Sequence, residues 1–278
     1  MRGLIGMGVA ALAIGLAGGV RAQDEECGGA DTPCEIADGT YHLRVPDGWD
    51  GQSPLPVLIF YHGFRGNGRS ILGSGGLETD FSDAGFLLVA PNGVVRESDG
   101  VRMYPARIGV MRDDVAFTLA VLDDVEARLP IDRTRLYASG FSAGGSMASL
   151  LACEVGDQLA GMVAVAGALR EPNPTECAGL AGLRVMQVHG FTDGQVPLEG
   201  RRIRDWHQGS VWESLDRARE RNGCRSNPDG IEIGDGWRRR DWDTSCSGGG
   251  EVRFLLHDGG HGLPPGWTAE ARRFFEGG

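Results

Sequence analysis

A serine, an aspartate and a histidine, far apart in the 278-residue chain, have the types and surroundings needed for nucleophilic catalysis. Ser142 lies in the stretch G-F-S-A-G at residues 140–144, between an apolar run and a segment rich in alanine and leucine. A serine hydroxyl is a weak nucleophile, so it needs a base within reach and N–H donors beside the reacting carbonyl. A sharp strand-to-helix turn supplies both, which makes Ser142 the candidate nucleophile.

The residues that flank Ser142 fit such a turn. Strand and helix approach so closely there that side chains at positions 140 and 144 would collide, and both positions are glycine. A helix that begins at Ala143 would direct its first N–H groups and its positive dipole end toward the reacting centre. G-x-S-x-G arises by chance in a chain with 46 glycines, so the interpretation depends on the strand before it and the helix after it.

Asp193 and His261 are the candidates to complete a catalytic triad with this serine. In a fold with this turn the partners follow in the order serine, acid, histidine. Asp193 follows the end of an expected strand, and His261 lies in a glycine-rich loop after the last expected strand. Asp258 is the weaker acid candidate because it comes too late in this order. The candidate oxyanion donors are the backbone N–H groups of Ala143 and of Phe64, which follows an earlier buried strand.

Other polar residues near expected strand and helix ends are assigned structural roles. His62 ends a strand and is expected to orient a loop, and His189 is expected to brace the loop that carries the acid. His257 is expected to be a packed or surface histidine. Asp113 and Asp114 precede a helical pattern, where negative charge favours the positive end of the helix dipole.

The expected strands and helices that position these residues alternate along the chain. Continuous apolar runs predict buried strands at residues 55–61, 86–90, 161–167, 183–189 and 251–257, and an alternating run predicts an edge strand at 39–45. Apolar residues at helical spacing predict helices over residues 113–129, 143–155 and 267–275. The alternation predicts an α/β fold with a doubly wound, mostly parallel sheet, whose active site lies at the carboxyl ends of the strands.

Two connecting segments complete this organisation. Only residues 168–182 separate two of the expected buried strands, which leaves no room for a cap domain and predicts an open cleft. Asp241 and Asp243 lie in a polar, arginine-rich segment that is expected to be a solvated loop.

The first 22 residues have the pattern of an export signal. A short charged start is followed by an apolar stretch from Leu4 to Leu16 and by small residues around Ala22. A membrane anchor is the alternative, but the apolar stretch is short and interrupted by glycine. We therefore expect a signal peptide at residues 1–22, a single catalytic domain at residues 23–278, and a secreted or periplasmic protein.

Composition narrows the partners of the chain. With 41% hydrophobic and 23% charged residues it can bury the core of a globular domain. A formal net charge of -11 argues against nucleic acid and against an anionic membrane surface as partners. The sequence contains no C-x-x-C or H-E-x-x-H pattern, so we expect no metal site, and a serine triad needs no cofactor.

All six cysteines lie after the expected signal peptide, and an even number in an exported chain predicts disulfides. Several pairings are possible, and the spacing favours neighbours in sequence. The expected pairs are Cys27 with Cys34, Cys153 with Cys177, and Cys224 with Cys246.

The chain resembles the secreted α/β-hydrolase esterases grouped as polyhydroxybutyrate depolymerase-like and feruloyl or acetylxylan esterase-like. The matching motifs are Tyr61-His-Gly63, Asp113-Asp-Val115, residues 132–148 with G-F-S-A-G-G inside them, His189-Gly-Phe-Thr-Asp193 with Val196-Pro197, Asn222-Gly-Cys224, and Gly260-His261. The resemblance implies Ser142 as nucleophile with Asp193 and His261, and Phe64 and Ala143 as oxyanion donors. It also supports the pairing of Cys224 with Cys246.

The resemblance further implies hydrolysis of carboxylic esters through an acyl-enzyme. The first expectation is an ester substrate of the polyhydroxyalkanoate type, as an oligomer or a polymer, and the alternative is a feruloyl or acetylxylan ester of plant cell-wall polysaccharide. A serine peptidase and a non-catalytic secreted binding protein are the less favoured alternatives. The chain departs from the family at Phe64, where members often have cysteine, and at residues 262–266, where members often have Trp-Pro-Gly.

Overall fold

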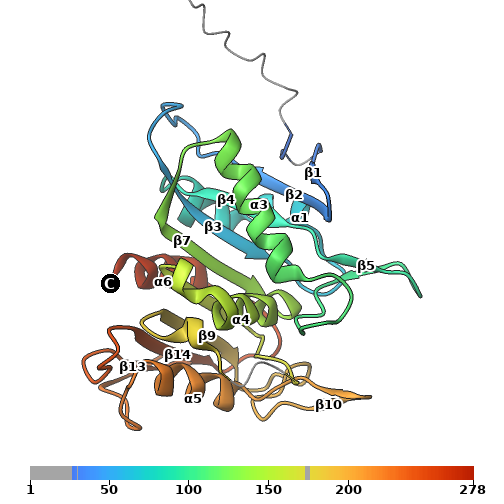
Figure 1. Cartoon of the computed structure of the whole chain (residues 1–278). Coiled ribbons are helices and arrows are strands. Elements are labelled where there is room, and N and C mark those ends of the chain that lie inside the picture. The colour runs from blue at the N-terminus through green and yellow to red at the C-terminus, as the bar shows by residue number, and fades with distance from the viewer. Residues whose placement is uncertain (1–26, 30, 173–175) are drawn as a thin grey trace, which may run out of the picture.

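The computed structural model describes residues 27–29, 31–172 and 176–278, so the expected signal peptide lies outside the described residues. A ten-stranded sheet forms its centre, and helices cover both faces of that sheet (Figure 1). The strand order across the sheet is β1-β2-β4-β3-β7-β8-β9-β14-β13-β12.

Six inner strands run parallel to one another, and antiparallel strands lie at both edges. The parallel strands are β4 (Leu87–Pro91), β3 (Leu55–Tyr61), β7 (Ile131–Phe141), β8 (Gly161–Val165), β9 (Arg184–Gly190) and β14 (Glu251–His257). The antiparallel strands are β1 (Cys34–Ile36) and β2 (Gly39–Arg44) at one edge, and β13 (Trp237–Trp242) and β12 (Gly230–Gly234) at the other. The prediction of a mostly parallel, doubly wound sheet is confirmed.

The apolar runs of the inner strands follow from their position between two helical layers. In β3, Val57, Ile59 and Tyr61 belong to one hydrophobic core, whereas Leu58 and Phe60 belong to the other. Successive side chains of a strand point to opposite faces, so a strand covered on both faces must be apolar at every position.

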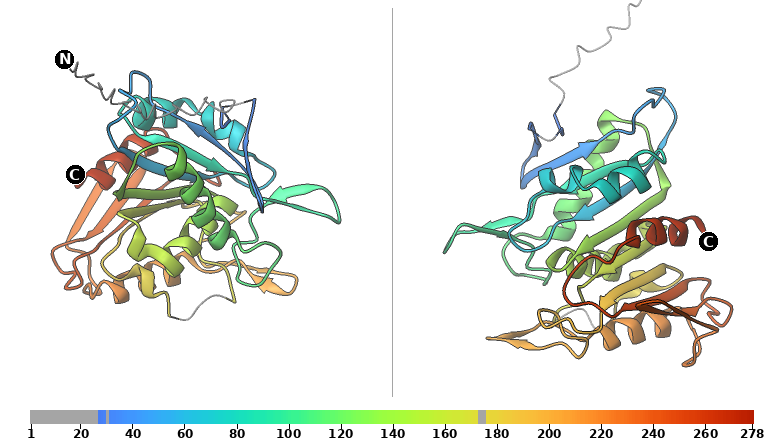
Figure 2. Two further views of the ribbon diagram at one scale, coloured as in Figure 1. Left: turned by 45° about the horizontal axis from the view of Figure 1, so that its top comes forward. Right: turned by 180° about the vertical axis from the view of Figure 1, so that it is seen from behind.

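The two helical layers are of different sizes. The first core is covered by α3 (Asp114–Arg128), α4 (Ala143–Val155) and α5 (Val211–Arg221), which lie in front of the sheet in Figure 1. The second core is covered by α1 (Gly68–Leu72), α2 (Gly75–Leu77), the π-helical turn η1 (Glu78–Ser82) and α6 (Trp267–Glu276), seen from behind in Figure 2. Short 3-10 turns, η2 (Gly156–Gln158) and η3 (Ala178–Leu180), flank β8 in sequence.

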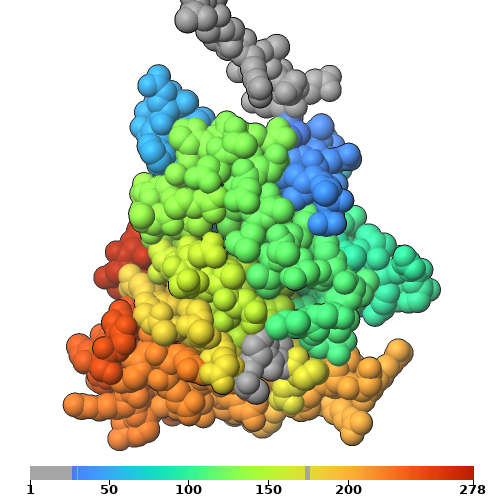
Figure 3. All heavy atoms as spheres, viewed as in Figure 1, coloured from blue at the N-terminus to red at the C-terminus, as the bar shows by residue number. Residues whose placement is uncertain are grey.

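Two small hairpins stand outside the main sheet. One consists of β5 (Val94–Arg96) and β6 (Val101–Met103), and the other of β10 (Arg202–Ile203) and β11 (Trp206–His207). Both protrude on the same side of the molecule, at the right of the space-filling view (Figure 3). The sequence did not predict either hairpin, and together they border the cleft that was expected to be open.

Two predictions about single elements are wrong. The edge of the sheet is β1 and not β2, because β1 pairs with the outer side of β2. Asp241 does not lie in a loop but in β13, and only Asp243 follows that strand. The arginine-rich strand is stabilised by ion pairs, since Asp241 contacts Arg239 at 2.9 Å and Arg253 at 2.6 Å, and Arg253 also contacts Glu270 at 3.0 Å.

Three disulfides join Cys27 to Cys34, Cys153 to Cys177, and Cys224 to Cys246, the neighbouring pairs that the spacing favours. The first attaches the start of the described chain to β1. The second connects α4 to the segment before η3, and the third connects the chain after α5 to the chain after β13. Among the described residues, no helix combines the length and the apolar composition that crossing a bilayer would require.

Candidate active site

The sheet brings the loops after β9 and β14 together because these two strands are parallel neighbours. Gly190 and His257 are register partners, so both chains leave the sheet at the same level. Beyond them, the N–H of Thr192 donates to the carbonyl of Gly259 at 3.1 Å. A Cβ atom on Gly190 would lie 2.2 Å from the carbonyl oxygen of Gly260, so only glycine permits this close approach.

The turn after β7 forces Ser142 into an unusual backbone conformation, with φ 57° and ψ -117°. Such a conformation is strained for a residue with a side chain and persists only where the surroundings impose it. A Cβ atom on Gly140 would lie 2.3 Å from the oxygen of Gly144, and one on Gly144 would lie 2.0 Å from the oxygen of Tyr61. The flanking glycines are therefore a steric requirement of the turn, as the sequence analysis expected.

The structure brings the three sequence-predicted residues into one hydrogen-bonded series. His261 Nε2 lies 2.9 Å from Ser142 Oγ, and His261 Nδ1 lies 2.8 Å from Asp193 Oδ2. The other carboxylate oxygen of Asp193 accepts hydrogen bonds from the N–H groups of Gln195 and Val196, both at 2.8 Å. With Nδ1 donating to the carboxylate, Nε2 is free to accept the serine proton, so the arrangement suits a general base.

His189 fixes the loop that carries Asp193, as expected from the sequence. Its Nδ1 accepts from the side-chain amide of Gln187 at 3.1 Å, so its Nε2 carries the proton and donates to the carbonyl of Val196 at 2.8 Å. The same Nε2 lies 3.4 Å from Asp193 Oδ2. Burial lowers the pKa of His189, which keeps the ring neutral beside the acid.

Phe141 is a contact of the catalytic centre that the sequence analysis missed. Its ring centroid lies 5.0 Å from that of His261, at an interplanar angle of 40°. The same ring would lie 3.2 Å from a Cβ atom on Gly63. Its position directly before Ser142 was the available signal, because the turn that exposes the serine also places its neighbours over the site.

Among the described residues, the backbone N–H groups of Ala143 and Phe64 are placed to bind an oxyanion. Ala143 is the first residue of α4, so its N–H has no acceptor within the helix. In the described part of the chain, no backbone or side-chain acceptor bonds to the N–H of Phe64. Phe64, Ala143 and Ser142 line the same cavity.

His62 supports the loop that carries Phe64. It is 1% exposed; its Nδ1 donates to the carbonyl of Gly63 at 2.8 Å, and its Nε2 accepts the N–H of Gly93 at 3.0 Å. Burial lowers the pKa of His62 to about 4. The residue therefore orients the loop, as expected, and stands outside the triad.

The remaining acidic candidates have structural partners. Asp258 forms an ion pair with Arg238 at 2.5 Å. Asp113 caps α3 by accepting from two backbone N–H groups, and Asp114 pairs with Arg112 at 2.6 Å. Within residues 27–29, 31–172 and 176–278, no cluster of three histidine, cysteine or acidic side chains could hold a metal ion.

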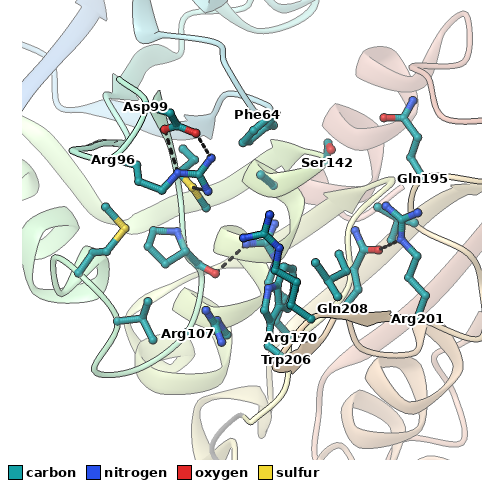
Figure 4. Close-up of a pocket in the computed structure, with 18 of the residues that line it drawn as sticks. Phe64, Arg96, Asp99, Arg107, Ser142, Arg170, Gln195, Arg201, Trp206 and Gln208 are labelled. Atoms are coloured by element: carbon teal, nitrogen blue, oxygen red, sulfur yellow. Dashed lines mark hydrogen bonds and ion pairs between the residues drawn. The ribbon is translucent and has the colours of Figure 1, made fainter. Parts of the chain in front are cut away.

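Ser142 opens onto a cavity of about 740 Å³ (Figure 4). Its walls come from both protruding hairpins, from residues 103–111, and from Gln195 and Val196 beside the acid. Pockets of a few hundred cubic ångströms are typical of small-molecule sites, so the nucleophile faces a space that can hold a substrate.

Comparison with known proteins adds named relatives. No protein-family model matches the chain. Feruloyl esterase C of Emericella nidulans is 30% identical over 236 residues, which cover 81% of this chain and 77% of the relative. A probable feruloyl esterase C of Aspergillus niger is 29% identical over 238 residues, with the same coverage. An acetyl xylan esterase from Aspergillus awamori has a TM-score of 0.65 at 13% identity, covering 88% of this chain and 98% of that structure. A carboxylesterase from Bacillus cereus has a TM-score of 0.55 at 20% identity, covering 85% and 93%.

The parallel sheet, the strained serine turn and the structural relatives define an α/β-hydrolase. The similarity to the named relatives shows that the chain is an esterase, which hydrolyses carboxylic esters. The chain belongs to the feruloyl esterase C family.

Proposed function

We propose that Ser142 is the nucleophile of this esterase, His261 its base and Asp193 the acid that orients the base. The observation that carries the proposal is the hydrogen-bonded series itself, with 2.9 Å between hydroxyl and imidazole and 2.8 Å between imidazole and carboxylate. These are the distances at which a base accepts the proton of a serine during attack.

The reaction proceeds in two half-reactions. Ser142 attacks the ester carbonyl while His261 takes its proton, and the N–H groups of Phe64 and Ala143 stabilise the oxyanion. His261 then donates that proton to the departing alcohol and leaves an acyl-enzyme on Ser142. Water, activated by His261, attacks the acyl group and releases the acid.

For the substrate we propose feruloyl or acetyl esters of plant cell-wall polysaccharide. The support is the family: the curated relatives with a matching length are named feruloyl esterases, and acetyl xylan esterases are among the structural neighbours. The hydroxyalkanoate substrate that the sequence analysis placed first has no such support, so the alternative becomes the better interpretation.

We also propose that residues 1–22 are removed as a signal peptide and that residues 23–278 act outside the cytoplasm as a single domain. Three disulfides support an oxidising compartment, where such bonds form and persist.

A panel of substrates tests the proposed reaction and its substrate class. We expect hydrolysis of p-nitrophenyl acetate, of methyl ferulate and of acetylated or feruloylated xylan oligosaccharides, and no cleavage of aminoacyl p-nitroanilides. Turnover of hydroxybutyrate oligomers without turnover of the ferulate and xylan esters would contradict the proposed substrate. Cleavage of the anilides alone would indicate a peptidase.

A further inference from the structure

The cavity beside Ser142 is lined by positive charge in a protein whose net charge is negative. Five arginines line it, namely Arg96, Arg107, Arg170, Arg201 and Arg204. The one carboxylate among the lining residues, Asp99, is paired with Arg96 through a hydrogen bond of 2.9 Å from Nε. No described acidic residue forms an ion pair with the other four. Against a formal net charge of -11, this concentration of unpaired cations is a local feature of the site.

Arg170 is the buried member of this group of five arginines. It is 6% exposed, and its Nη1 donates to the carbonyls of Tyr104 at 2.9 Å and Pro105 at 2.7 Å. Its buried Nε has no hydrogen-bond partner among the described residues. Burial, with a smaller contribution from Arg107, lowers the pKa of Arg170 to about 10, so the guanidinium stays charged at neutral pH. A buried cation without an anionic partner is costly, and an anionic ligand would offset that cost.

Trp206 holds two of the cations at the cavity wall. The guanidinium carbons of Arg107 and Arg170 lie 4.9 Å and 5.0 Å from the centroid of its ring. In Figure 4, Arg96, Arg107 and Arg201 enter from different sides of the view, and Arg170 lies beside Trp206 between them. Cation–π contacts restrict the planes of the guanidinium groups, which prepares them for a planar anion.

A solvated surface would explain the more exposed arginines. Arg201 and Arg204 are exposed, and Nε of Arg201 donates to the side chain of Gln208 at 2.9 Å. Two acidic residues of the same segments, Glu97 and Asp205, are exposed and stand outside the lining. Solvation does not explain Arg170, which is more than nine-tenths buried and still lines the cavity.

We infer that the cavity selects esters that carry a free carboxylate away from the scissile bond, bound by Arg170 and Arg107 while Ser142 attacks the ester carbonyl. A guanidinium group presents parallel N–H donors that match a carboxylate. The inference rests on the proposed ester hydrolysis at Ser142. Two kinds of substrate share this chemistry: an acylated saccharide with a uronic acid unit, and a hydroxy-acid oligomer with its acid end free.

The test compares each acid with its neutral amide. One pair is acetylated glucuronic acid and acetylated glucuronamide, and the other is the 3-hydroxybutyrate dimer and its amide. We expect kcat/KM to be about tenfold higher for the acid than for the amide in one of the pairs, through a lower KM, and the difference to shrink in concentrated salt. The pair that shows the difference identifies the source of the carboxylate.

Variants connect the preference to the arginines. Arg170→Gln and Arg107→Gln are expected to bring the ratio of kcat/KM between acid and amide close to one. Because Arg170 also holds two backbone carbonyls, the less buried Arg107 keeps the test decisive if the first variant fails to fold. Arg69→Gln is the matched control, since it removes the same charge from an exposed arginine that pairs with Asp31, and it should retain the preference.

Equal kcat/KM for acid and amide in both pairs would overturn the inference and leave ester hydrolysis intact. Failure of the proposed function looks different, because the protein would then hydrolyse neither the acids, nor the amides, nor p-nitrophenyl acetate. In that case calorimetric titrations of the Ser142→Ala variant with glucuronate and with the 3-hydroxybutyrate dimer still decide the inference. Saturable binding of either acid that Arg107→Gln weakens would support it, and absence of binding of both acids would refute it.

Discussion

Acidification should destabilise the fold through His62, which anchors the loop of the proposed oxyanion site. The ring is 1% exposed and already uses both nitrogens, one as donor to Gly63 and one as acceptor from the N–H of Gly93. Protonation would place a second N–H against that of Gly93 and would charge a buried ring. Both effects disfavour the imidazolium in the folded state, in line with a pKa lowered from 6.5 to about 4.

The magnitude follows from the difference between the folded and unfolded pKa values of His62. Each pKa unit corresponds to about 1.4 kcal/mol, so the shift to about 4 amounts to about 3 kcal/mol. Between pH 6.5 and about 4 the unfolded chain binds more protons at this ring than the folded chain does. The contribution of His62 to the free energy of unfolding is therefore fully present above pH 6.5. It is lost as the pH falls from 6.5 to about 4. The lowered pKa of His189 acts in the same direction.

Urea unfolding of the wild type and of His62→Gln, at pH values of about 7 and about 4, measures this effect. Glutamine can still accept the N–H of Gly93 but does not titrate, and the other acidic groups titrate alike in both proteins. We expect the free energy of unfolding of the wild type to fall by about 3 kcal/mol more than that of the variant over this interval. Equal losses in the two proteins would refute the reasoning.

Three further predictions concern the turn, a disulfide and the acid. Gly144→Ala should lower the free energy of unfolding by about 3 kcal/mol or more, because its Cβ would lie 2.0 Å from a carbonyl oxygen of β3. Thermal melting should show this loss. The control Gly73→Ala should change the melting temperature little, because a Cβ atom at Gly73 would have no neighbour within 4 Å. Replacing both Cys153 and Cys177 by alanine should lower the free energy of unfolding by about 3.5 kcal/mol in urea, and an unchanged midpoint would contradict the entropic argument. Asp193→Asn should lower kcat by about 10⁴-fold in an ester assay, because the imidazole loses the partner that fixes its tautomer.

The sequence predicted best those elements whose burial or steric requirement restricts the residue types directly. The strands at residues 55–61 and 251–257 and the helix at residues 143–155 have the predicted bounds. A strand buried on both faces must be continuously apolar, and the strained turn must have glycine at Gly140 and Gly144, so each leaves a pattern that can be read directly. The order serine, acid, histidine, together with the strand ends that Asp193 and His261 were expected to follow, selected the three residues that the structure places in contact.

The sequence predicted poorly where tertiary contacts override local pattern. The arginine-rich strand β13 resembled a solvated loop in sequence. In the structure its Arg239 forms ion pairs with Asp241, Glu232 and Glu270. The hairpins around the cavity have strands of two or three residues, too short to show a period of two. Arg204 in one of their turns has φ 52°, a conformation that an arginine in the sequence does not predict. The sequence therefore could not predict the cationic cavity, because the cavity is formed in part by these hairpins.

The central claim is that the hydroxyl of Ser142 is activated for attack by the imidazole beside it. Labelling with a fluorophosphonate, followed by mass spectrometry of the labelled peptide, tests this directly. We predict a single adduct on Ser142 in the wild type, no adduct in Ser142→Ala, and a kcat for ester hydrolysis about a million-fold lower in that variant. An unlabelled Ser142, or wild-type esterase activity in Ser142→Ala, would contradict the account.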